Sequence, residues 1–546
     1  MDKLADEIST SEKQLFVGLA GPGTGKSTTF KTIVESDSFK NKRILILSFI
    51  NKLVNDLSND FRGYDNVTVL TLHSFALAKF KEFVSGADIT LEEELDDLVS
   101  EDQRFIKEEK VDYKQNLYEG GLSSDEETFY KARSKFYGGS LKLYSFNSII
   151  YAVNRLFSEK EDKIPNDYDL ILVDEFQDFN QLEYNLINHL NKKNKVVIVG
   201  DDDQSLYGWK NAKPDLIRNL YDHEDNGNFT LDYCYRCPVV IINAVNSLIK
   251  NATDKGFLND RKNKQFLCPT NLSEKKIEIN NKYPKIDFLS GVKGDKLIYQ
   301  LSERIQSDMG GDRDNRILLI TPSHLKQSVQ EGLLKKGFHV VEFELFANEE
   351  RNKMKHRKII EAFTVLAKRK TDNLALRKIL GLYLGNDELK TLVCNSDKNN
   401  KSLWNSLEEG TKRKIESDIE LFKKARAGKK LLSDSELLRV NEIFNLKNLI
   451  SKMIRGFNHV QKGSAELEMT TTMSSKGLSA DFVYYLGIDD RDMLKRETGK
   501  LSNQKICEFL VGMTRAKKKL TLIALESSNP KILEFVDKSY INSLAS

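Results

Sequence analysis

Polar residues with the chemistry of a phosphate or metal site directly follow two apolar segments of strand length. The segment 170–173 ends at Asp174 and Glu175, and the segment 196–199 leads into a polar run that holds Gln204. Apolar strands that stop at polar residues are typical of a buried parallel sheet, which presents a site at its carboxyl edge. The two carboxylates could hold magnesium and polarise water, and Gln204 could lie beside a nucleotide phosphate.

A glycine-rich turn lies between an apolar segment, 15–19, and a helical pattern that starts near Thr28. Its glycines would let backbone N–H groups close around phosphates, with Lys26 reaching the terminal ones and the Ser27 hydroxyl ligating magnesium. Because the strand, the Gly-Lys-Ser sequence and the helix occur together, phosphate binding explains the turn better than flexibility does. The residues predicted to bind the nucleotide here are Gly21, Pro22, Gly23, Thr24, Gly25, Lys26, Ser27 and Thr28.

Aromatic residues also follow the predicted strands. Phe49 comes after the segment 43–47, Phe75 comes after the segment 67–70, and Trp209 closes the polar run that holds the glutamine. Aromatic rings can stack on bases and so bind single-stranded nucleic acid with little sequence preference. Taken alone, Phe49 and Phe75 fit ordinary core positions better than a stacking role, and only the adjacent nucleotide site makes them candidates for stacking.

The strand pattern that positions these residues is interrupted twice by charged helical sequence. The first interruption, 78–144, contains an acidic run, 91–98, which we interpret as a solvated helix face. The second, 348–462, has apolar residues at helical spacing and two basic clusters, at 368–370 and 423–424. The remaining sequence predicts two α/β domains, the first formed by residues 1–77 and 145–228 and the second by residues 229–347 and 463–546.

Composition sets limits on the class of protein. A chain of 546 residues suits two to four domains of roughly 100 to 200 residues each. Lysine and arginine total 84 against 81 acidic residues, so nucleic-acid binding would need local basic surface and not a global field. No basic-then-apolar leader and no membrane-length apolar run are visible, so we expect a cytoplasmic protein that does not enter a membrane.

The five cysteines are too scattered for a disulfide framework, which fits a reducing compartment. Cys234 and Cys237 have the spacing of half a zinc site, but only Cys268 follows nearby. A zinc site usually needs a second pair of ligands, so we expect no structural zinc here.

Taken in order, the motifs resemble those of superfamily 1 helicases of the UvrD/Rep/PcrA type. The runs Asp174–Asp178 and Gly200–Trp209 are the most specific, since few other ATPases need a glutamine and a tryptophan at these places. The resemblance implies an α/β fold of two RecA-like P-loop motor domains with parallel sheets, each interrupted by a mainly helical subdomain. The matching segments are Ala20–Ser27, Ser48–Lys52, Thr71–Phe75, Val173–Asp178, Val199–Trp209, Tyr235–Arg236, Ser475–Leu478 and Val511–Ala516.

The resemblance also implies a role for each motif at an ATP and Mg²⁺ site. Lys26 and Ser27 would bind the phosphates and the magnesium. Asp174 would hold the magnesium, and Glu175 would act as general base on the attacking water. Gln204 would sense the terminal phosphate. From the second domain, Tyr235 would stack on the base of ATP, Arg236 and Arg515 would act as arginine fingers, and Gly477 would approach the nucleotide.

The function implied by the resemblance is ATP-dependent 3′ to 5′ translocation on single-stranded DNA, with unwinding of tailed duplexes. Stacking worth roughly 1 to 3 kcal/mol per base would let the motor release one base and take up the next at modest cost. The residues expected to contact DNA are Phe49, Asn51, His73, Phe75, Tyr207 and Trp209.

Three features depart from the family pattern. The family places a glutamine well upstream of the phosphate loop to read adenine, whereas Gln14 lies too close to that loop to do so. Met473 and Ser479 stand where the family often has histidine and glutamate, and both helical insertions are short. These departures leave open an alternative: a DNA-end sensing or recruitment ATPase of a repair or phage-defence complex, paired with a separate nuclease and unwinding little.

Two other readings fit the residues less well. A fused nuclease is not expected, because the sequence after the Arg515 motif holds no carboxylate and lysine cluster. A kinase-like ATPase would not explain Gln204 and Trp209.

Overall fold

The structure is a computed structural model that describes residues 2–48, 51–84, 88–206, 208–310, 315–342, 348–428, 432–444, 467–494 and 499–544. The chain divides into two compact units. Unit 1 comprises Met1–Phe75, Leu156–Phe346 and Gly463–Ser546, and unit 2 comprises Ala76–Arg155 and Ala347–Lys462. Unit 1 therefore holds both α/β regions, and unit 2 holds both helical insertions.

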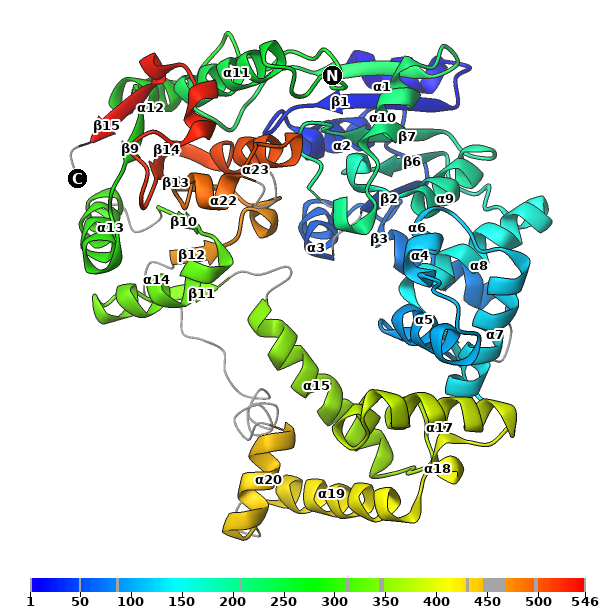
Figure 1. Ribbon diagram of the computed structural model, residues 1–546. Coiled ribbons are helices and arrows are strands. Elements are labelled where there is room, and N and C mark those ends of the chain that lie inside the picture. The colour runs from blue at the N-terminus through cyan, green and yellow to red at the C-terminus, as the bar shows by residue number, and fades with distance from the viewer. Residues whose placement is uncertain are drawn as a thin grey trace. The chain divides into compact units, whose positions relative to one another are not determined.

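Among the described residues, the first sheet of unit 1 has six parallel strands in the order β3-β2-β6-β7-β1-β8 (Figure 1). Its inner strands are continuous apolar runs because they are buried on both faces. The carboxyl ends of parallel strands meet at one edge, which gathers the residues that follow β1, β6 and β7. The strands are β1 Leu15–Ala20, β2 Ile44–Ser48, β3 Val67–Thr71, β6 Leu170–Val173, β7 Val196–Gly200 and β8 Gly227–Leu231.

Helices pack against this sheet through apolar residues such as Ala5, Ile33 and Leu57, which share one core with the strands. The helices of this part are α1 Asp2–Thr10, α2 Lys26–Glu35, α3 Asn51–Asp60, α9 Gln181–Asn191 and α10 Pro214–Asp222. The chain passes from unit 1 to unit 2 within α4 (Leu72–Phe83) and returns within α8 (Phe146–Glu159).

Strand β8 belongs to the first sheet, where it pairs with β1. The predicted start of the second domain at residue 229 is therefore too early. Two glycines let β8 pack beside β1. A Cβ on Gly18 would lie 2.4 Å from the ring of Phe229, and one on Gly227 would lie 2.3 Å from the ring of Phe16. The strand is only half-buried and partly polar, so it lacks the apolar run that marks the inner strands.

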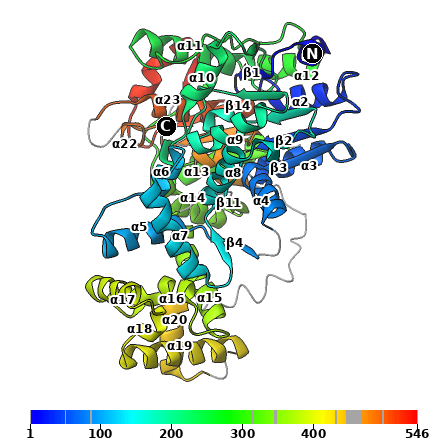
Figure 2. The same ribbon diagram turned by 90° about the vertical axis from the view of Figure 1, so that its right-hand side faces the viewer.

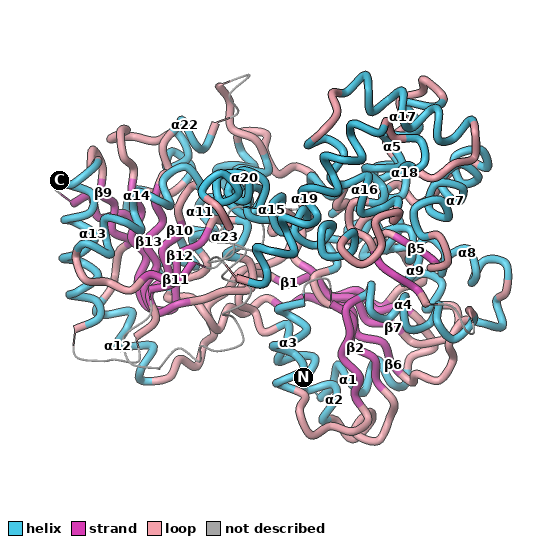
Figure 3. Tube along the Cα trace, turned by 90° about the horizontal axis from the view of Figure 1, so that it is seen from below, coloured by secondary structure: helices cyan, strands magenta, loops and turns pink. Residues whose placement is uncertain are grey.

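The second sheet of unit 1 has seven parallel strands, within the described ranges, in the order β11-β12-β10-β13-β14-β9-β15. Figure 3 shows the two sheets as separate groups of strands. The predicted α/β class with parallel sheets is confirmed. The strands are β9 Ile286–Leu289, β10 Ile317–Ile320, β11 Val340–Glu342, β12 Leu467–Thr470, β13 Ala480–Leu486, β14 Ala516–Ile523 and β15 Ile541–Leu544.

Three of these strands, β9, β12 and β15, escaped prediction because each is short and carries a polar residue, respectively Asp287, Glu468 and Asn542. Helices α11 and α23 pack on one face of the sheet, and α13 and α14 pack on the other. The helices of this part are α11 Val239–Asp254, α12 Glu274–Lys282, α13 Gly294–Met309, α14 Ser323–Lys335, α22 Asp490–Met493 and α23 Asn503–Met513.

Unit 2 is mainly helical, with one small pair of parallel strands, β4 (Ile89–Leu91) and β5 (Lys142–Tyr144). Figure 2 shows its helices α15 to α20 gathered together, and the rings of Phe363, Phe422 and Phe444 form their core at centroid distances of 4.8 to 5.8 Å. The helices are α5 Leu95–Ile106, α6 Tyr113–Tyr118, α7 Ser124–Gly138, α15 Asn348–Leu366, α16 Asn373–Ile379, α17 Asn386–Lys398, α18 Leu403–Ser406, α19 Glu409–Ala427 and α20 Asp434–Phe444. Within the described ranges, no helix combines the length and apolarity that crossing a membrane would need.

A buried ion network joins the two insertions within unit 2. Asp102 is fully buried and accepts hydrogen bonds from Arg133 Nε at 2.7 Å and from the Tyr137 hydroxyl at 2.6 Å. Arg377 of the second insertion adds a contact to the same carboxylate at 3.4 Å. Buried charges of this kind need such partners, so the two insertions fold against each other.

The acidic run 91–98 is not the solvated face that the sequence predicted. Glu92 pairs with Lys378 at 2.6 Å and Glu94 pairs with Lys358 at 2.8 Å, both from the second insertion. The basic partners lie more than 260 residues away in the sequence, so no local pattern could identify them.

Candidate nucleotide-binding site

The phosphate loop connects β1 to α2 and depends on two glycines in the left-handed region. Gly23 has φ 70° and Gly25, which precedes α2, has φ 86°. A Cβ on Gly23 would also lie 2.5 Å from Arg236 Cβ, so only glycine lets the loop approach the second half of unit 1 so closely. The Thr24 hydroxyl donates to the Gly21 carbonyl at 2.9 Å and closes the turn.

The acidic pair at the end of β6 is buried and rigidly held. The Glu175 backbone N–H donates to Asp174 Oδ1 at 2.9 Å, and Gln177 Nε2 donates to Glu175 Oε2 at 2.6 Å. Glu175 has φ 53°, a conformation that non-glycine residues adopt mainly where surrounding contacts enforce it, often at functional sites. Lys26 Nζ lies 3.5 Å from Glu175 Oε1, which brings the phosphate loop and the acidic pair together.

The two carboxylates have different electrostatic surroundings. Burial and the neighbouring Glu175 charge raise the pKa of Asp174. Burial opposes ionisation of Glu175 as well, but Lys26 and then Lys476 outweigh it and lower the pKa of Glu175. Glu175 is therefore the ionised member of the pair.

Gln204 links the two halves of unit 1. Its Nε2 donates to Asp201, and its Oε1 accepts a hydrogen bond from Arg515 at 3.1 Å. Arg515 is 2% exposed and also donates to the carbonyls of Val511 at 2.8 Å and Leu478 at 3.3 Å. Burial and then the nearby Arg236 lower the pKa of Arg515 to about 9.

Lys476 is a site residue that the sequence analysis did not single out. Its ammonium pairs with Asp178, donates to the Gln204 carbonyl at 2.9 Å and lies 3.7 Å from Glu175 Oε2. The signal was present in the Ser-Lys-Gly-Leu motif, but a lysine in a short loop does not reveal its partner about 300 residues earlier. Lys476 thus ties the second sheet to the acidic strand end.

Cys234 and Cys237 flank Tyr235 and Arg236 in the core of the second half. The Cys237 backbone N–H donates to Cys234 Sγ at 3.4 Å, and Cys237 Sγ contacts the Thr514 carbonyl at 3.6 Å. Hydrogen bonding with Cys237 lowers the pKa of Cys234 to about 6. The pair fixes the segment that carries Arg236, which donates to the same Thr514 carbonyl at 3.3 Å.

A cavity of about 590 Å³ lies among these groups. The predicted residues that line it are Pro22, Gly23, Thr24, Gly25, Lys26, Ser27, Thr28, Asp174, Glu175, Gln204, Tyr235, Arg236, Gly477 and Arg515. Gly21 lies just outside the lining, beside Thr24. The lining residues that the sequence did not single out are Ser273, Lys275, Lys276, Ile279, Asp481, Lys517 and Lys518.

The cavity has the properties of a nucleotide polyphosphate site. Cationic side chains line it together with the N-terminus of α2, and both attract phosphate. The Tyr235 side chain, in a residue 54% exposed, lies at the same cavity and could stack on a base. The Ser27 hydroxyl and the Asp174 carboxylate are oxygen donors of the kind that Mg²⁺ prefers, so the lining fits a magnesium–nucleotide complex.

The predicted DNA-contacting residues are only partly described. Phe49 and Tyr207 lie outside the described residues, and Asn51 and Trp209 are described for the backbone alone, in α3 and in a short helical turn at Gly208–Lys210. His73 lies in α4, where burial and then Lys210 lower its pKa to about 3, so the imidazole is neutral at pH 7.

The stacking role predicted for Phe75 is wrong. Phe75 is 1% exposed, and its side chain is among the largest that are fully buried. A ring that packs in the core cannot also offer a face to a base. The structure shows Phe75 in an ordinary core position, which its sequence context also allowed.

Comparison with known proteins identifies related sequences. The model of the UvrD/REP helicase N-terminal domain matches residues 103–225. A "Probable DNA helicase II homolog" of Mycoplasma capricolum is 26% identical over 468 residues, which cover 74% of this chain and 61% of that protein. The ATP-dependent DNA helicase Rep of Buchnera aphidicola is 23% identical over 617 residues, covering 92% and 90% of the two chains. The ATP-dependent DNA helicase PcrA of Staphylococcus aureus is 25% identical over 291 residues, covering 46% and 40%.

Proposed function

We propose that this chain, a UvrD-like superfamily 1 helicase by sequence, is an ATP-dependent DNA translocase that moves 3′ to 5′ along single strands and unwinds tailed duplexes. The observation that supports this best is the hydrogen bond from Arg515 to Gln204, because it joins the second sheet to the phosphate-sensing end of the first. A motor needs such a contact, since hydrolysis in one cavity must change how two halves of the protein meet.

In the proposed reaction, Lys26 binds the terminal phosphates and leaves its present partner, Glu175. Glu175 then accepts a proton from the water that attacks the terminal phosphate as the bond from that phosphate to ADP breaks. Asp174 and Ser27 would hold the magnesium. When bound, Mg²⁺ neutralises charge on the phosphate oxygens. Arg236 and Arg515 supply positive charge from the second half of unit 1, as arginine fingers do in other nucleotide hydrolases.

Coupling to DNA would follow from loss of the terminal phosphate. Gln204 and the Lys476 ammonium share a hydrogen bond, and Lys476 also pairs with Asp178. A change in charge at the phosphate would therefore alter the electrostatic interactions both at the end of β7 and in the loop that follows β12. We propose that Phe49, Tyr207 and Trp209 then release and retake bases by stacking.

The test measures ATP hydrolysis with and without single-stranded DNA, followed by strand displacement on duplexes with 3′ or 5′ tails. We expect stimulation by single strands and displacement from the 3′ tail alone. Hydrolysis at one rate whatever the nucleic acid would overturn the motor function.

A second function, that of a DNA-end sensing or recruitment ATPase with a separate nuclease or repair partner, is supported by unit 2. Lys358 and Lys378 of the second insertion are paired with acidic residues of the first. These cations are thus occupied and less able to bind duplex phosphates. DNA-stimulated hydrolysis without displacement of either tailed duplex would favour this function.

A further inference from the structure

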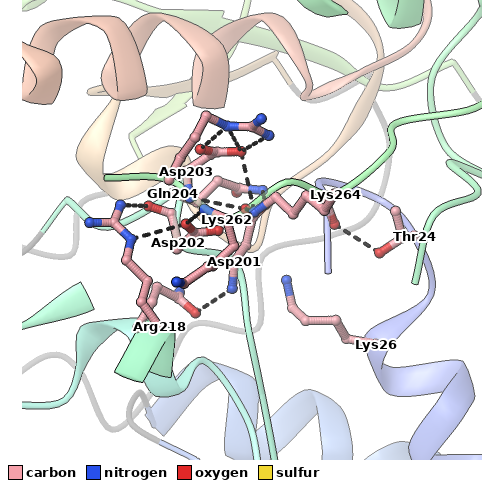
Figure 4. Close-up of polar contacts among 12 residues, drawn as sticks. Thr24, Lys26, Asp201, Asp202, Asp203, Gln204, Arg218, Lys262 and Lys264 are labelled. Carbon is pink, nitrogen blue, oxygen red and sulfur yellow. Dashed lines mark hydrogen bonds and ion pairs between the residues drawn. The ribbon is translucent and has the colours of Figure 1, made fainter. Parts of the chain in front are cut away.

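Three consecutive carboxylates at the end of β7 are held by one buried lysine. Asp201, Asp202 and Asp203 are each at most 2% exposed, and one carboxylate oxygen from each lies within 4.8 Å of the other two. Lys264 Nζ lies 2.5 Å from Asp201, 2.6 Å from Asp202 and 3.2 Å from Asp203 (Figure 4). Like charges this close repel strongly when buried, so the cluster needs a cation at its centre.

Two arginines complete the cluster from outside. Arg218 Nε lies 3.0 Å from Asp202, and Arg261 Nη2 lies 2.9 Å from Asp203. Both side chains are 14% exposed, whereas that of Lys264 is 4% exposed. Lys264 thus contacts all three carboxylates, and each of these arginines salt-bridges one of them.

The segment that carries Lys264 is fixed to the second half of unit 1. It follows α11, and the apolar residues Leu258 and Phe266 on either side of the lysine belong to the core of the second sheet. The lysine therefore reaches from one half of unit 1 to the strand end of the other.

Asp201 connects this cluster to the catalytic groups. Its carboxylate accepts from Gln204 Nε2, and its backbone N–H donates to Gln177 Oε1 at 2.7 Å. Gln177 Nε2 in turn donates to Glu175 at 2.6 Å. The position of Asp201 thus bears on both the phosphate-sensing glutamine and the general base.

We propose that Lys264 is a positioning residue that holds Asp201, and through it Gln204, in place for ATP hydrolysis. The proposal rests on the proposed ATPase function. Without the ammonium, three adjacent buried carboxylates would move apart or draw in another cation. Gln204 would then lose its fixed acceptor and present its Oε1 to Arg515 less accurately, and misplacement of about 1 Å can cost on the order of 10²-fold in rate.

The test compares Lys264→Met with Lys262→Met, a matched control two residues away. The Lys262 side chain pairs with Asp222 at the surface, and the backbone N–H that it donates to Asp202 remains in the variant. We expect kcat of DNA-stimulated hydrolysis to fall about 10- to 100-fold in Lys264→Met, with KM for ATP changed less than about twofold. Lys262→Met should keep the wild-type values, and Lys264→Arg should recover most of kcat.

Hydrogen exchange provides a readout that does not depend on turnover. The amides of Asp203 and Gln204 are held by Asp201, at 3.2 Å to its carboxylate and 2.9 Å to its carbonyl. Both should exchange faster in Lys264→Met and not in Lys262→Met. If the wild-type protein shows no DNA-stimulated hydrolysis, the proposed function is refuted. If Lys264→Met keeps the wild-type exchange rates and the wild-type kcat, only the positioning role of Lys264 is refuted.

Discussion

Replacement of Arg515 by methionine should separate activity from stability. The guanidinium is buried and makes hydrogen bonds to the carbonyls of Val511 and Leu478 and to Gln204 Oε1. Methionine has similar length and no charge, so it fills the space while removing every donor. The change tests whether this arginine serves the reaction or the fold.

The effect on stability can be worked out from two opposing contributions. The Leu478 carbonyl and Gln204 Oε1 lose their donor, which costs roughly 1 to 3 kcal/mol each, or roughly 2 to 6 kcal/mol together, whereas the Val511 carbonyl still accepts from the Thr514 hydroxyl at 3.0 Å. Against this, the native protein no longer buries a cation. Burial, and then Arg236, lower the pKa of Arg515 from 12.5 to about 9, which corresponds to roughly 5 kcal/mol against the charged form. The two contributions nearly cancel, so we expect the free energy of unfolding to change by no more than about 3 kcal/mol.

Activity should respond very differently. Loss of an arginine finger lowers turnover by about 10³ to 10⁵, and the lost bond to Gln204 acts in the same direction. The assay is steady-state hydrolysis of ATP with single-stranded DNA, beside urea unfolding of the same samples. Arg316→Met is the control, because Arg316 pairs with Glu468 at the surface of the same unit, where such pairs contribute little.

Two results would refute this reasoning. Turnover within tenfold of wild type would show that Arg515 does not contribute charge to the reaction. A loss of stability well above 4 kcal/mol, with activity falling in proportion to the unfolded fraction, would show that its role is structural.

Three further predictions concern other groups. Glu175→Gln should bind ATP and DNA normally but hydrolyse ATP about 10² to 10⁴ times more slowly, as equilibrium binding and single-turnover rates would show; unchanged turnover would remove Glu175 as the base. Because the pKa of Cys234 is lowered from 9.0 to about 6, chiefly by the Cys237 thiol, its thiolate stabilises the native state above pH 9, and this contribution is lost as the pH falls through 6. The difference in unfolding free energy between wild type and Cys234→Ser should therefore shrink from pH 9 to pH 6, and a constant difference would contradict it. Arg133→Met removes the closest cation of the buried Asp102 carboxylate and leaves only the Tyr137 hydroxyl at 2.6 Å and Arg377 at 3.4 Å, so it should destabilise unit 2 by about 3 kcal/mol, measured by calorimetry, while wild-type unfolding would show the network to be dispensable.

Most of the residues that line the candidate nucleotide site were predictable from the sequence. A phosphate loop needs glycines, a lysine and a hydroxyl in a fixed order. The carboxyl end of a buried parallel strand is marked in the sequence by a change from apolar to polar residues. Asp174, Glu175 and Gln204 therefore stood out without any structure, and all three line the cavity together with Lys26 and Ser27. Local geometry sets such patterns, so local sequence carries them.

Pairings between distant segments could be decided only by the tertiary structure. Lys264 lies at the centre of three carboxylates about 60 residues earlier, and Lys476 reaches Asp178 across about 300 residues. A lysine in a loop has the same sequence signature whether it is solvated or buried against a carboxylate. Its role depends on burial, which raises the cost of an unpaired charge from almost nothing to several kcal/mol. The sequence by itself determined which reactive and phosphate-binding groups this protein has. The packing of its two sheets decided which charged side chains pair with those groups and position them.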